Sequence, residues 1–199
     1  MFSFLKRQKN ERYDQASLAA ALVNVVGQIS KKELFTLYSY ALQLRQGAVA
    51  VEIGSYKGKS AVALGFGAQR VGARVYCIDP HDAFVGVAGG VFGPGDLKDK
   101  IRHIHRFDLG DVVFPICLSS TRVAEIWDKP VDLLWIDGDH TYEFVSKDFL
   151  GFSPHVVPGG VIILHDREME GVAKLISEID SSVFESMNTV DAMAIYRKR

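Results

Sequence analysis

An acidic residue and two glycines are spaced in a pattern that suits ligand binding. Glu52, Gly54 and Gly58 form E-x-G-x-x-x-G at the end of a short apolar run. Because glycine has no Cβ, the backbone can turn sharply here and approach a ligand closely. Dinucleotide sites use G-x-G-x-x-G instead, and Ser55 stands in place of the second glycine. The acidic residue therefore favours a cationic ligand over a phosphate, although any strand–turn–helix unit can carry two glycines.

Two pairs of aspartate and histidine follow two later apolar runs. Asp137 and His140 come after one run, and His165 and Asp166 come after the next. If these runs are neighbouring parallel strands, their carboxyl ends meet at one edge of the sheet, beside the glycine turn. Carboxylates and imidazoles are costly to bury without a function. A single histidine at a strand end is usually structural, but two such pairs favour a functional site.

Asp79 ends another expected strand, 74–79, and lies about 20 residues after the glycine turn. From this position a carboxylate can accept hydrogen bonds from both ribose hydroxyls of an adenosine. The alternative is a turn or N-cap role, which the following Pro80 would assist. We favour the ribose contact.

Three phrases of the sequence resemble one group of enzymes. The pattern at Glu52 resembles the first motif of class I methyltransferases that use S-adenosylmethionine (SAM), whose ammonium and sulfonium groups are cationic. The phrases I-D-G-D-H-T-Y-E at 136–143 and P-G-G-V-I-I-L-H-D at 158–166 are similar to those of small-molecule methyltransferases. That group includes the macrocin and rhamnosyl O-methyltransferases and cephalosporin hydroxylase-like proteins. The D-G-x-H-x-Y phrase is the most specific of the three, and the resemblance covers residues 49–166.

The resemblance implies a Rossmann-like α/β methyltransferase fold. We expect a mostly parallel seven-stranded sheet in the order 3-2-1-4-5-7-6, with helices on both faces and an antiparallel C-terminal hairpin. Pro115 marks the run 112–116 as an edge strand, which the third strand is in this order. The apolar run 131–136 suits a central strand. The methyltransferase domain would span residues 48–199.

Residues 1–47 would form an N-terminal tail and a helical appendage. Apolar residues from Leu18 to Ile29 recur at helical spacing, and a capping box at Ser30 starts a second helix that Gly47 stops. In such enzymes N-terminal helices cover the cofactor or build a homodimer contact. Plain packing against the sheet is the alternative.

The activity that the resemblance implies is transfer of a methyl group from SAM to a hydroxyl of a small molecule, a sugar or a natural-product scaffold. The residues expected to bind the cofactor are Glu52, Gly54, Ser55, Gly58, Ser60, Asp79, Ser119 and Asp137. Ser119 follows the third strand, where a polar residue of the family meets the adenine, and helix capping is the alternative. A valine at Gly54 would block the cofactor and leave the protein folded.

Two alternatives remain for activation of the hydroxyl. Several members of the wider group use a divalent metal, and by position Asp137 and Asp166 would be its ligands, with His165 as a third. Mg²⁺ prefers oxygen ligands, whereas a histidine ligand favours a transition metal, so metal dependence stays open. Without a metal, His140 or His165 would be the catalytic base, because an imidazole titrates near neutral pH.

The insertion 84–95 contains too many glycines for a regular helix or strand. We expect a loop that acts as a lid or is a disordered excursion. Asp96 would then cap a helix, and its buried face would carry Leu97, Ile101 and Ile104.

Composition limits the partners of the chain. Its 199 residues are 48% hydrophobic and 24% charged, with a formal net charge of −1. This charge argues against general binding of nucleic acid. No apolar run is long enough to cross a bilayer. Residues 1–12 are interpreted as a solvated tail, with peripheral membrane contact through Phe2, Phe4 and Leu5 as the alternative. Cys77 and Cys117 are expected to be buried free thiols in a reducing compartment, the cytoplasm.

The sequence bears on three alternatives to a small-molecule methyltransferase. The main alternative is a non-catalytic SAM- or nucleotide-binding partner subunit. An NAD-dependent oxidoreductase is disfavoured by the glycine spacing and by the terminal hairpin. A nucleic-acid methyltransferase is disfavoured because the sequence has no Asn/Asp-Pro-Pro-Tyr/Phe motif and no basic stripe.

Overall fold

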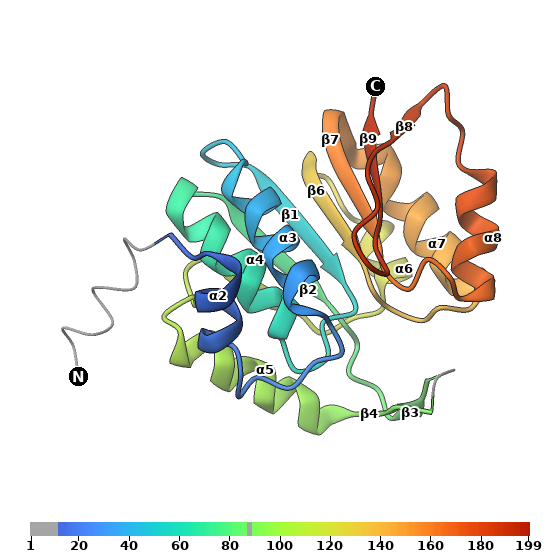
Figure 1. Ribbon diagram of the computed structural model, residues 1–199. Coiled ribbons are helices and arrows are strands. Elements are labelled where there is room, and N and C mark those ends of the chain that lie inside the picture. The colour runs from blue at the N-terminus through green and yellow to red at the C-terminus, as the bar shows by residue number, and fades with distance from the viewer. Residues whose placement is uncertain (1–11, 87–88) are drawn as a thin grey trace.

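The computed structural model describes residues 12–86 and 89–199, so the interpretation of the tail before Arg12 lies outside the described residues. A sheet of seven strands in the order β5-β2-β1-β6-β7-β9-β8 forms the centre (Figure 1). Its strands are β1 (Val49–Ile53), β2 (Arg74–Ile78), β5 (Val113–Ile116), β6 (Val131–Ile136), β7 (Val156–Leu164), β8 (Phe184–Ser186) and β9 (Ala194–Lys198). Strands β5, β2, β1, β6 and β7 are parallel to one another. Strand β9 pairs antiparallel with β7, and β8 pairs antiparallel with β9. Numbered along the chain, this is the order 3-2-1-4-5-7-6, which confirms the predicted fold.

Helices cover both faces of the sheet, as Figure 1 shows. Those on one side are α2 (Gln15–Ala21), α3 (Lys31–Leu42), α4 (Lys59–Val71) and α5 (Pro94–Arg106). Those on the other are α6 (Ser120–Ala124), α7 (Tyr142–Phe152) and α8 (Glu170–Glu178), and η1 (Ser153–His155) leads from α7 into β7. Because side chains alternate along a strand, Leu133 and Trp135 of β6 enter the first core, and Leu134 and Ile136 enter the second.

The N-terminal helices pack on α4. Ser30 and Glu33 form the predicted capping box of α3, and α3 crosses α4 where Gly67 removes a side chain. A Cβ on Gly67 would lie 2.6 Å from the backbone oxygen of Tyr38. The expected lengths were wrong: α2 ends at Ala21 and α3 at Leu42, because the chain turns after each although apolar residues continue.

We expected the insertion 84–95 to be an irregular loop because of its glycines, but part of it forms two short strands. Strands β3 (Phe84–Val85) and β4 (Val91–Phe92) pair antiparallel, and the rings of Phe84 and Phe92 stack with centroids 4.8 Å apart. Pairing of the two short strands and stacking of the two rings therefore hold β3 and β4 together.

Helix α5 begins three residues earlier than predicted, with Gly93 rather than Asp96 as N-cap. Asp96 lies inside the first turn, where its carboxylate accepts the N–H of Gly93 at 2.8 Å. The predicted apolar face was also wrong. Ile101 is 47% exposed, whereas Lys100 is fully buried, because Lys100 faces the glycine turn after β1.

Two smaller expectations concern the thiols and the membrane. Cys77 is buried in β2, but Cys117 is exposed, because it follows the edge strand β5 where no neighbouring strand covers it. No helix among the described residues has the length and apolarity that a membrane span requires.

Candidate active site

The ends of β1, β6 and β7 lie in register at the carboxyl edge of the sheet. The N–H of Asp137 donates to the backbone oxygen of Ile53 at 2.8 Å, and the N–H of His165 donates to that of Ile136 at 3.0 Å. The ladder thus continues one residue past each strand. Asp137 is therefore fixed beside Gly54, and His165 is fixed beside Asp137, as predicted from the strand order.

Gly54 makes the closest backbone approach in this region. Its φ is +79°, in the left-handed region that favours glycine. A Cβ built here would lie 2.2 Å from the backbone oxygen of Asp137. The glycine turn and the end of β6 are thus in direct contact, and we expect a valine at Gly54 to destabilise the fold as well as to block the cofactor.

His165 lies between two acidic environments. Its Nδ1 is 2.9 Å from Asp137 Oδ1 and 3.4 Å from Asp166 Oδ2, and its Nε2 is 3.4 Å from Glu33 Oε1. Burial opposes the charged imidazolium, but hydrogen bonds to these carboxylates outweigh it and raise the pKa of His165 to about 12. Both ring nitrogens face carboxylates, so His165 is held rather than free to move.

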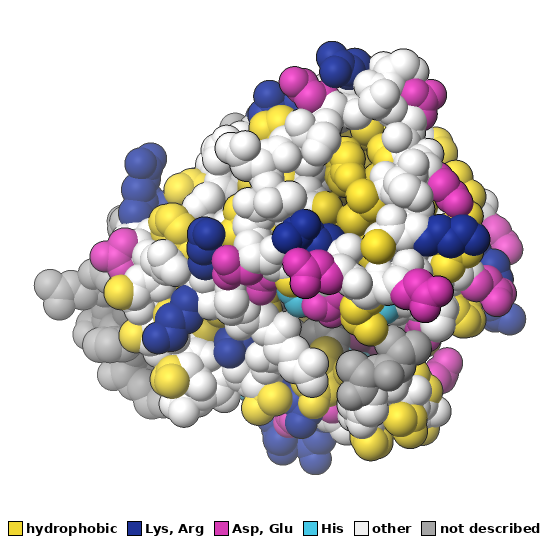
Figure 2. Space-filling model, turned by 45° about the vertical axis from the view of Figure 1, so that its right-hand side comes forward, with side chains coloured by type: hydrophobic (Ala, Val, Ile, Leu, Met, Phe, Trp, Pro, Cys, Tyr) yellow, Lys and Arg dark blue, Asp and Glu magenta, His cyan; other side chains and the backbone are white. Residues whose placement is uncertain are grey.

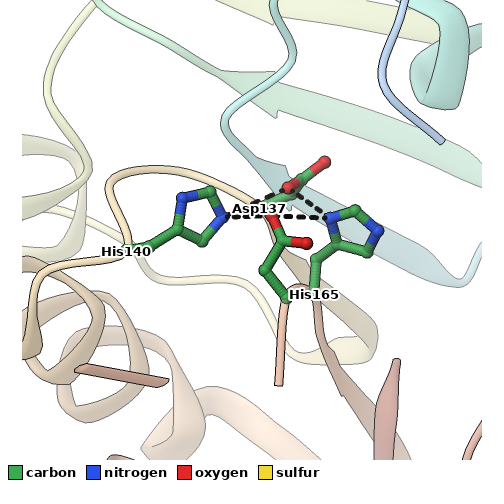
Figure 3. Close-up of side chains that lie close together, drawn as sticks. Asp137, His140 and His165 are labelled. Carbon is green, nitrogen blue, oxygen red and sulfur yellow. Dashed lines mark hydrogen bonds and ion pairs between the residues drawn. The ribbon is translucent and has the colours of Figure 1, made fainter. Parts of the chain in front are cut away.

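His140 approaches the same carboxylates from the loop before α7. Its Nε2 is 3.1 Å from Asp166 Oδ2 and 3.7 Å from Asp137 Oδ1. Figure 3 shows the two imidazoles pointing toward Asp137 from opposite sides. Burial would lower the pKa of His140, but hydrogen bonding and charge of Asp137, with the charge of Asp166, raise it above its ordinary value.

The four residues predicted to gather here do so. Asp137, His140, His165 and Asp166 each offer one ligand atom, and these atoms lie within 4.8 Å of one another. We call these four residues the Asp/His cluster. Asp166 takes a left-handed φ of 49°, a conformation that costs energy for a residue other than glycine and is common at functional sites.

Glu33 is a site residue that sequence reasoning missed. Its Oε2 accepts the N–H of Ser30 at 2.9 Å, as the capping box predicts, but its Oε1 accepts the N–H of Ala192 at 2.9 Å and faces His165. Burial would raise the pKa of Glu33, but the hydrogen bond from His165 and those from the two backbone N–H groups lower it. Only the packing of α3 beside the segment that leads into β9 could reveal this second role of Glu33.

Asp79 organises the glycine turn. Its Oδ2 accepts the N–H groups of Ser55 and Tyr56, each at 2.9 Å, and its Oδ1 accepts the N–H of His81 at 2.9 Å. Tyr56 and His81 have positive φ values of 43° and 55°. The carboxylate therefore stabilises two unusual backbone conformations at the carboxyl ends of β1 and β2.

A buried pair of opposite charges lies beneath the glycine turn. Glu52 and Lys100 are both fully buried, and Lys100 Nζ donates to Ser55 Oγ at 2.8 Å. Neither carboxylate oxygen of Glu52 has a hydrogen bond of good geometry within the described residues. Burial raises the pKa of Glu52 to about 7, and the nearby Ser60 hydroxyl, Cys77 thiol and Lys100 ammonium limit the rise. Sequence reasoning missed Lys100 because it assigned the buried face of α5 to apolar residues.

Replacing Glu52 with glutamine is expected to change how stability depends on pH. The folded chain keeps a proton on Glu52 that the unfolded chain releases, so the free energy of unfolding falls between the ordinary pKa of 4.5 and about 7. The glutamine variant should avoid this fall and gain up to about 3 kcal/mol at pH 8. Urea unfolding at pH 4.5 and 8 measures the difference, with exposed Glu125→Gln as control. Parallel pH profiles for the wild type and the Glu52 variant would contradict this assignment.

The other predicted cofactor residues surround the turn. Ser60 is buried in the first turn of α4, and Gly58 has a φ of +84°, with the Lys100 side chain against it. Ser119 occupies the N-cap of α6 but makes no capping hydrogen bond, and its hydroxyl meets that of Thr121 at 3.2 Å. The hydroxyl of Ser119 is therefore not committed to the helix end.

A comparison with protein families identifies the domain. The family model of a methyltransferase domain matches residues 51–167, more than half of the chain. The chain belongs to this family. The matched range contains the glycine turn and the Asp/His cluster, whereas Glu33 lies before it.

Relatives among curated proteins match this methyltransferase domain over shorter stretches. An uncharacterized protein of Acanthamoeba polyphaga mimivirus is 28% identical over 93 residues, which is 43% of this chain and 39% of that protein. An uncharacterized protein of Sinorhizobium fredii is 42% identical over 45 residues, which is 23% of this chain and 5% of that protein. The matches thus span about two fifths and one twentieth of the relatives' own lengths.

Solved structures share the fold at low sequence identity. A Podospora anserina methyltransferase bound to S-adenosylhomocysteine has a TM-score of 0.70 at 13% identity, covering 99% of this chain and 93% of that one. The O-methyltransferase TomG from Streptomyces achromogenes, involved in tomaymycin synthesis and bound to SAM, has a TM-score of 0.65 at 13% identity. The match covers 95% of this chain and 91% of TomG. An rRNA methylase from Streptococcus thermophilus has 0.62 at 12%, covering 86% and 99%. The family match supports methyl transfer, and these structures share the fold although their names give different acceptors.

Proposed function

We propose that this methyltransferase domain transfers a methyl group from SAM to a hydroxyl of a small molecule, a sugar or a natural-product scaffold. The observation that carries the proposal is the contact between the glycine turn and the Asp/His cluster. The backbone oxygen of Asp137 lies against Gly54, so a cofactor held at the turn has carboxylates and imidazoles beside it. Such groups suit removal of a proton from an acceptor hydroxyl.

The cofactor-binding residues proposed for SAM line one edge of the sheet. They are Glu52, Gly54, Ser55, Gly58, Ser60, Asp79, Ser119 and Asp137. SAM itself supplies the electrophilic methyl group, so the protein must mainly align the acceptor with the sulfonium. Asp79 already fixes the turn through Ser55 and Tyr56. A ribose contact would use the remaining acceptor capacity of its carboxylate.

When the cluster binds no metal, its proton acceptor is His140. Its side chain is 19% exposed, and its Nε2 has no hydrogen bond of good geometry within the described residues. His165 faces carboxylates through both nitrogens, so it positions the cluster instead. His140 must be neutral to accept a proton, and its pKa is raised. Transfer should therefore increase with pH through a midpoint above the ordinary 6.5 of histidine.

An acidic cavity beside the cluster supports a polyhydroxylated acceptor. It has a volume of about 310 Å³ and is lined by Asp166, Glu168, Met169, Asp191 and Ala192. Figure 2 shows acidic side chains around histidine surface in a hollow of this face. Carboxylates accept hydrogen bonds from hydroxyls, and they would repel the phosphates of a nucleic acid. The formal net charge of −1 agrees with this preference.

Calorimetric titration with SAM and with NAD tests the cofactor. The wild type is expected to bind SAM and not NAD. Asp79→Ala should weaken SAM binding by about 10- to 150-fold, because a charge-assisted hydrogen bond contributes about 1.5–3 kcal/mol. Exposed Asp82→Ala on the same loop is the matched control. Unchanged affinity in the Asp79 variant would contradict the ribose contact.

Transfer of labelled methyl groups from SAM to a panel of sugars and phenols tests the reaction. Label in a hydroxyl acceptor supports the proposal. Tight SAM binding without transfer to any hydroxyl would favour the alternative, a non-catalytic SAM-binding partner subunit.

A further inference from the structure

The Asp/His cluster has the donors of a metal site. It presents two carboxylate oxygens and two imidazole nitrogens within 4.8 Å of one another. The His140 Nε2 is shielded from solvent, lacks a hydrogen bond of good geometry within the described residues, and is 3.1 Å from Asp166 Oδ2. Four donors this close together, from two strand ends and one loop, could all bind a single ion.

Glu33 stands behind His165, on the side away from the cluster. It is 3.4 Å from Nε2, whereas Nδ1 faces Asp137 at 2.9 Å. If Nε2 carries a proton directed at Glu33, the lone pair of Nδ1 is left facing the cluster. Metal-binding histidines commonly donate their second N–H to a carboxylate in this way. Glu33 is itself fixed by the N–H groups of Ser30 and Ala192, so it can hold the ring in one orientation.

We propose that Asp137, His140, His165 and Asp166 bind a divalent transition metal, with Glu33 as the carboxylate that orients His165. Metal binding by these residues stands independently, and only its part in the reaction rests on the proposed function. The two cluster carboxylates match the charge of a divalent cation, and the Glu33 charge is matched by the proton on His165.

The donor set favours a transition metal over Mg²⁺. Mg²⁺ requires near-octahedral oxygen coordination, and two of the four donors here are nitrogen. Imidazole and carboxylate together suit Zn²⁺, Co²⁺ and similar ions, whose affinity for such sites exceeds that of Mg²⁺. When bound, such a metal would supply a Lewis acid that lowers the pKa of an acceptor hydroxyl. His140 and His165 would then hold the ion rather than take the proton.

Metal titration of the full chain, without an affinity tag and after chelator treatment, tests the proposal. Calorimetry is expected to give one Zn²⁺ per chain, bound at least about 100-fold more tightly than Mg²⁺. Co²⁺ should develop visible absorption bands when its ligands include the two imidazoles. Zn²⁺ binding no tighter than Mg²⁺ binding would overturn the proposal.

Variants locate the site. Glu33→Gln is expected to weaken Zn²⁺ binding by about 10- to 100-fold, and it keeps the capping box, which accepts glutamine. His140→Gln and His165→Gln should weaken binding further, whereas exposed His105→Gln should not. Circular dichroism confirms that each variant is folded. If His105→Gln lost as much Zn²⁺ affinity as the cluster variants, the metal would lie elsewhere. If Glu33→Gln bound Zn²⁺ as tightly as the wild type, Glu33 would not orient His165.

The same preparations separate this proposal from the proposed function. SAM binding by a chain that does not bind Zn²⁺ would overturn the metal site and leave the methyltransferase proposal intact. Zn²⁺ binding by a chain that does not bind SAM would support the metal site and overturn the proposed use of SAM.

Discussion

Replacing Gly54 with alanine is expected to lower the free energy of unfolding by about 2–5 kcal/mol and to abolish SAM binding. The left-handed conformation costs an alanine about 1–2 kcal/mol, and overpacking costs about 1–3 kcal/mol more. The overpacking arises because the new Cβ would lie 2.2 Å from the backbone oxygen of Asp137 and 2.6 Å from the Cα of Gly138. These are backbone atoms just past the end of β6, where the hydrogen bond from the N–H of Asp137 to Ile53 fixes the chain, so they cannot rotate away.

Gly47→Ala is a matched control for this variant. Gly47 has a φ of +77°, close to the +79° of Gly54, but nothing lies within 4 Å of its added Cβ. The control therefore isolates the conformational cost from the steric cost. Urea unfolding of both variants measures the difference, and calorimetry with SAM measures the effect on binding. Equal destabilisation by the two variants would show that contact between the turn and β6 is not tight.

The strand order was predicted from the resemblance to methyltransferases, whereas the position of the four cluster residues at strand ends depends on local patterns. An apolar run followed by a polar residue marks the carboxyl end of a buried parallel strand, and parallel strands place such ends at one edge. This rule alone predicts that Asp137 and His165 lie at the same edge of the sheet. The ladder of backbone hydrogen bonds that continues past Ile53 and Ile136 then sets their alignment.

The residues that were missed depend on contacts between distant elements. Glu33 fits a capping box completely, so nothing local indicates that one of its oxygens faces His165. Lys100 lies three residues after Leu97 and four before Ile104, which is helical spacing for the buried face, but a lysine there is usually assigned to solvent. Only the approach of α5 to the glycine turn gives its ammonium a partner, Ser55.

The appendage and the matched domain therefore cooperate at one site. Glu33 comes from α3, outside the family match at 51–167, yet it contacts His165 inside that match. The cluster contains two carboxylates and two imidazoles, and Glu33 adds a third carboxylate behind one ring. These carboxylates raise the pKa of His140 and, to about 12, that of His165, so loss of one carboxylate should change the pH at which the site works.

In chelator-treated protein, where His140 is the proton acceptor, replacing it with glutamine is expected to lower kcat by about 10²- to 10⁴-fold, because a positioned general base contributes about that much. Its affinity for SAM should stay near that of the wild type, since His140 lies on the acceptor side of the cluster rather than at the glycine turn. Calorimetry and labelled-methyl transfer measure the two effects separately. Exposed His105→Gln is the control, and a wild-type kcat in His140→Gln would exclude this residue from proton transfer.

The pH profile gives a sharper test of the same role than the rate alone. In the wild type, Asp137 and Asp166 overcome the effect of burial and raise the pKa of His140, so kcat should increase with pH around a midpoint above 6.5. Asp137→Asn removes the larger of these two influences and leaves a side chain of the same size. Its midpoint should therefore move to lower pH, and the increase should be absent from His140→Gln. A midpoint unmoved in Asp137→Asn would assign the titration to another group, because no purely structural role of Asp137 shifts a profile in this direction.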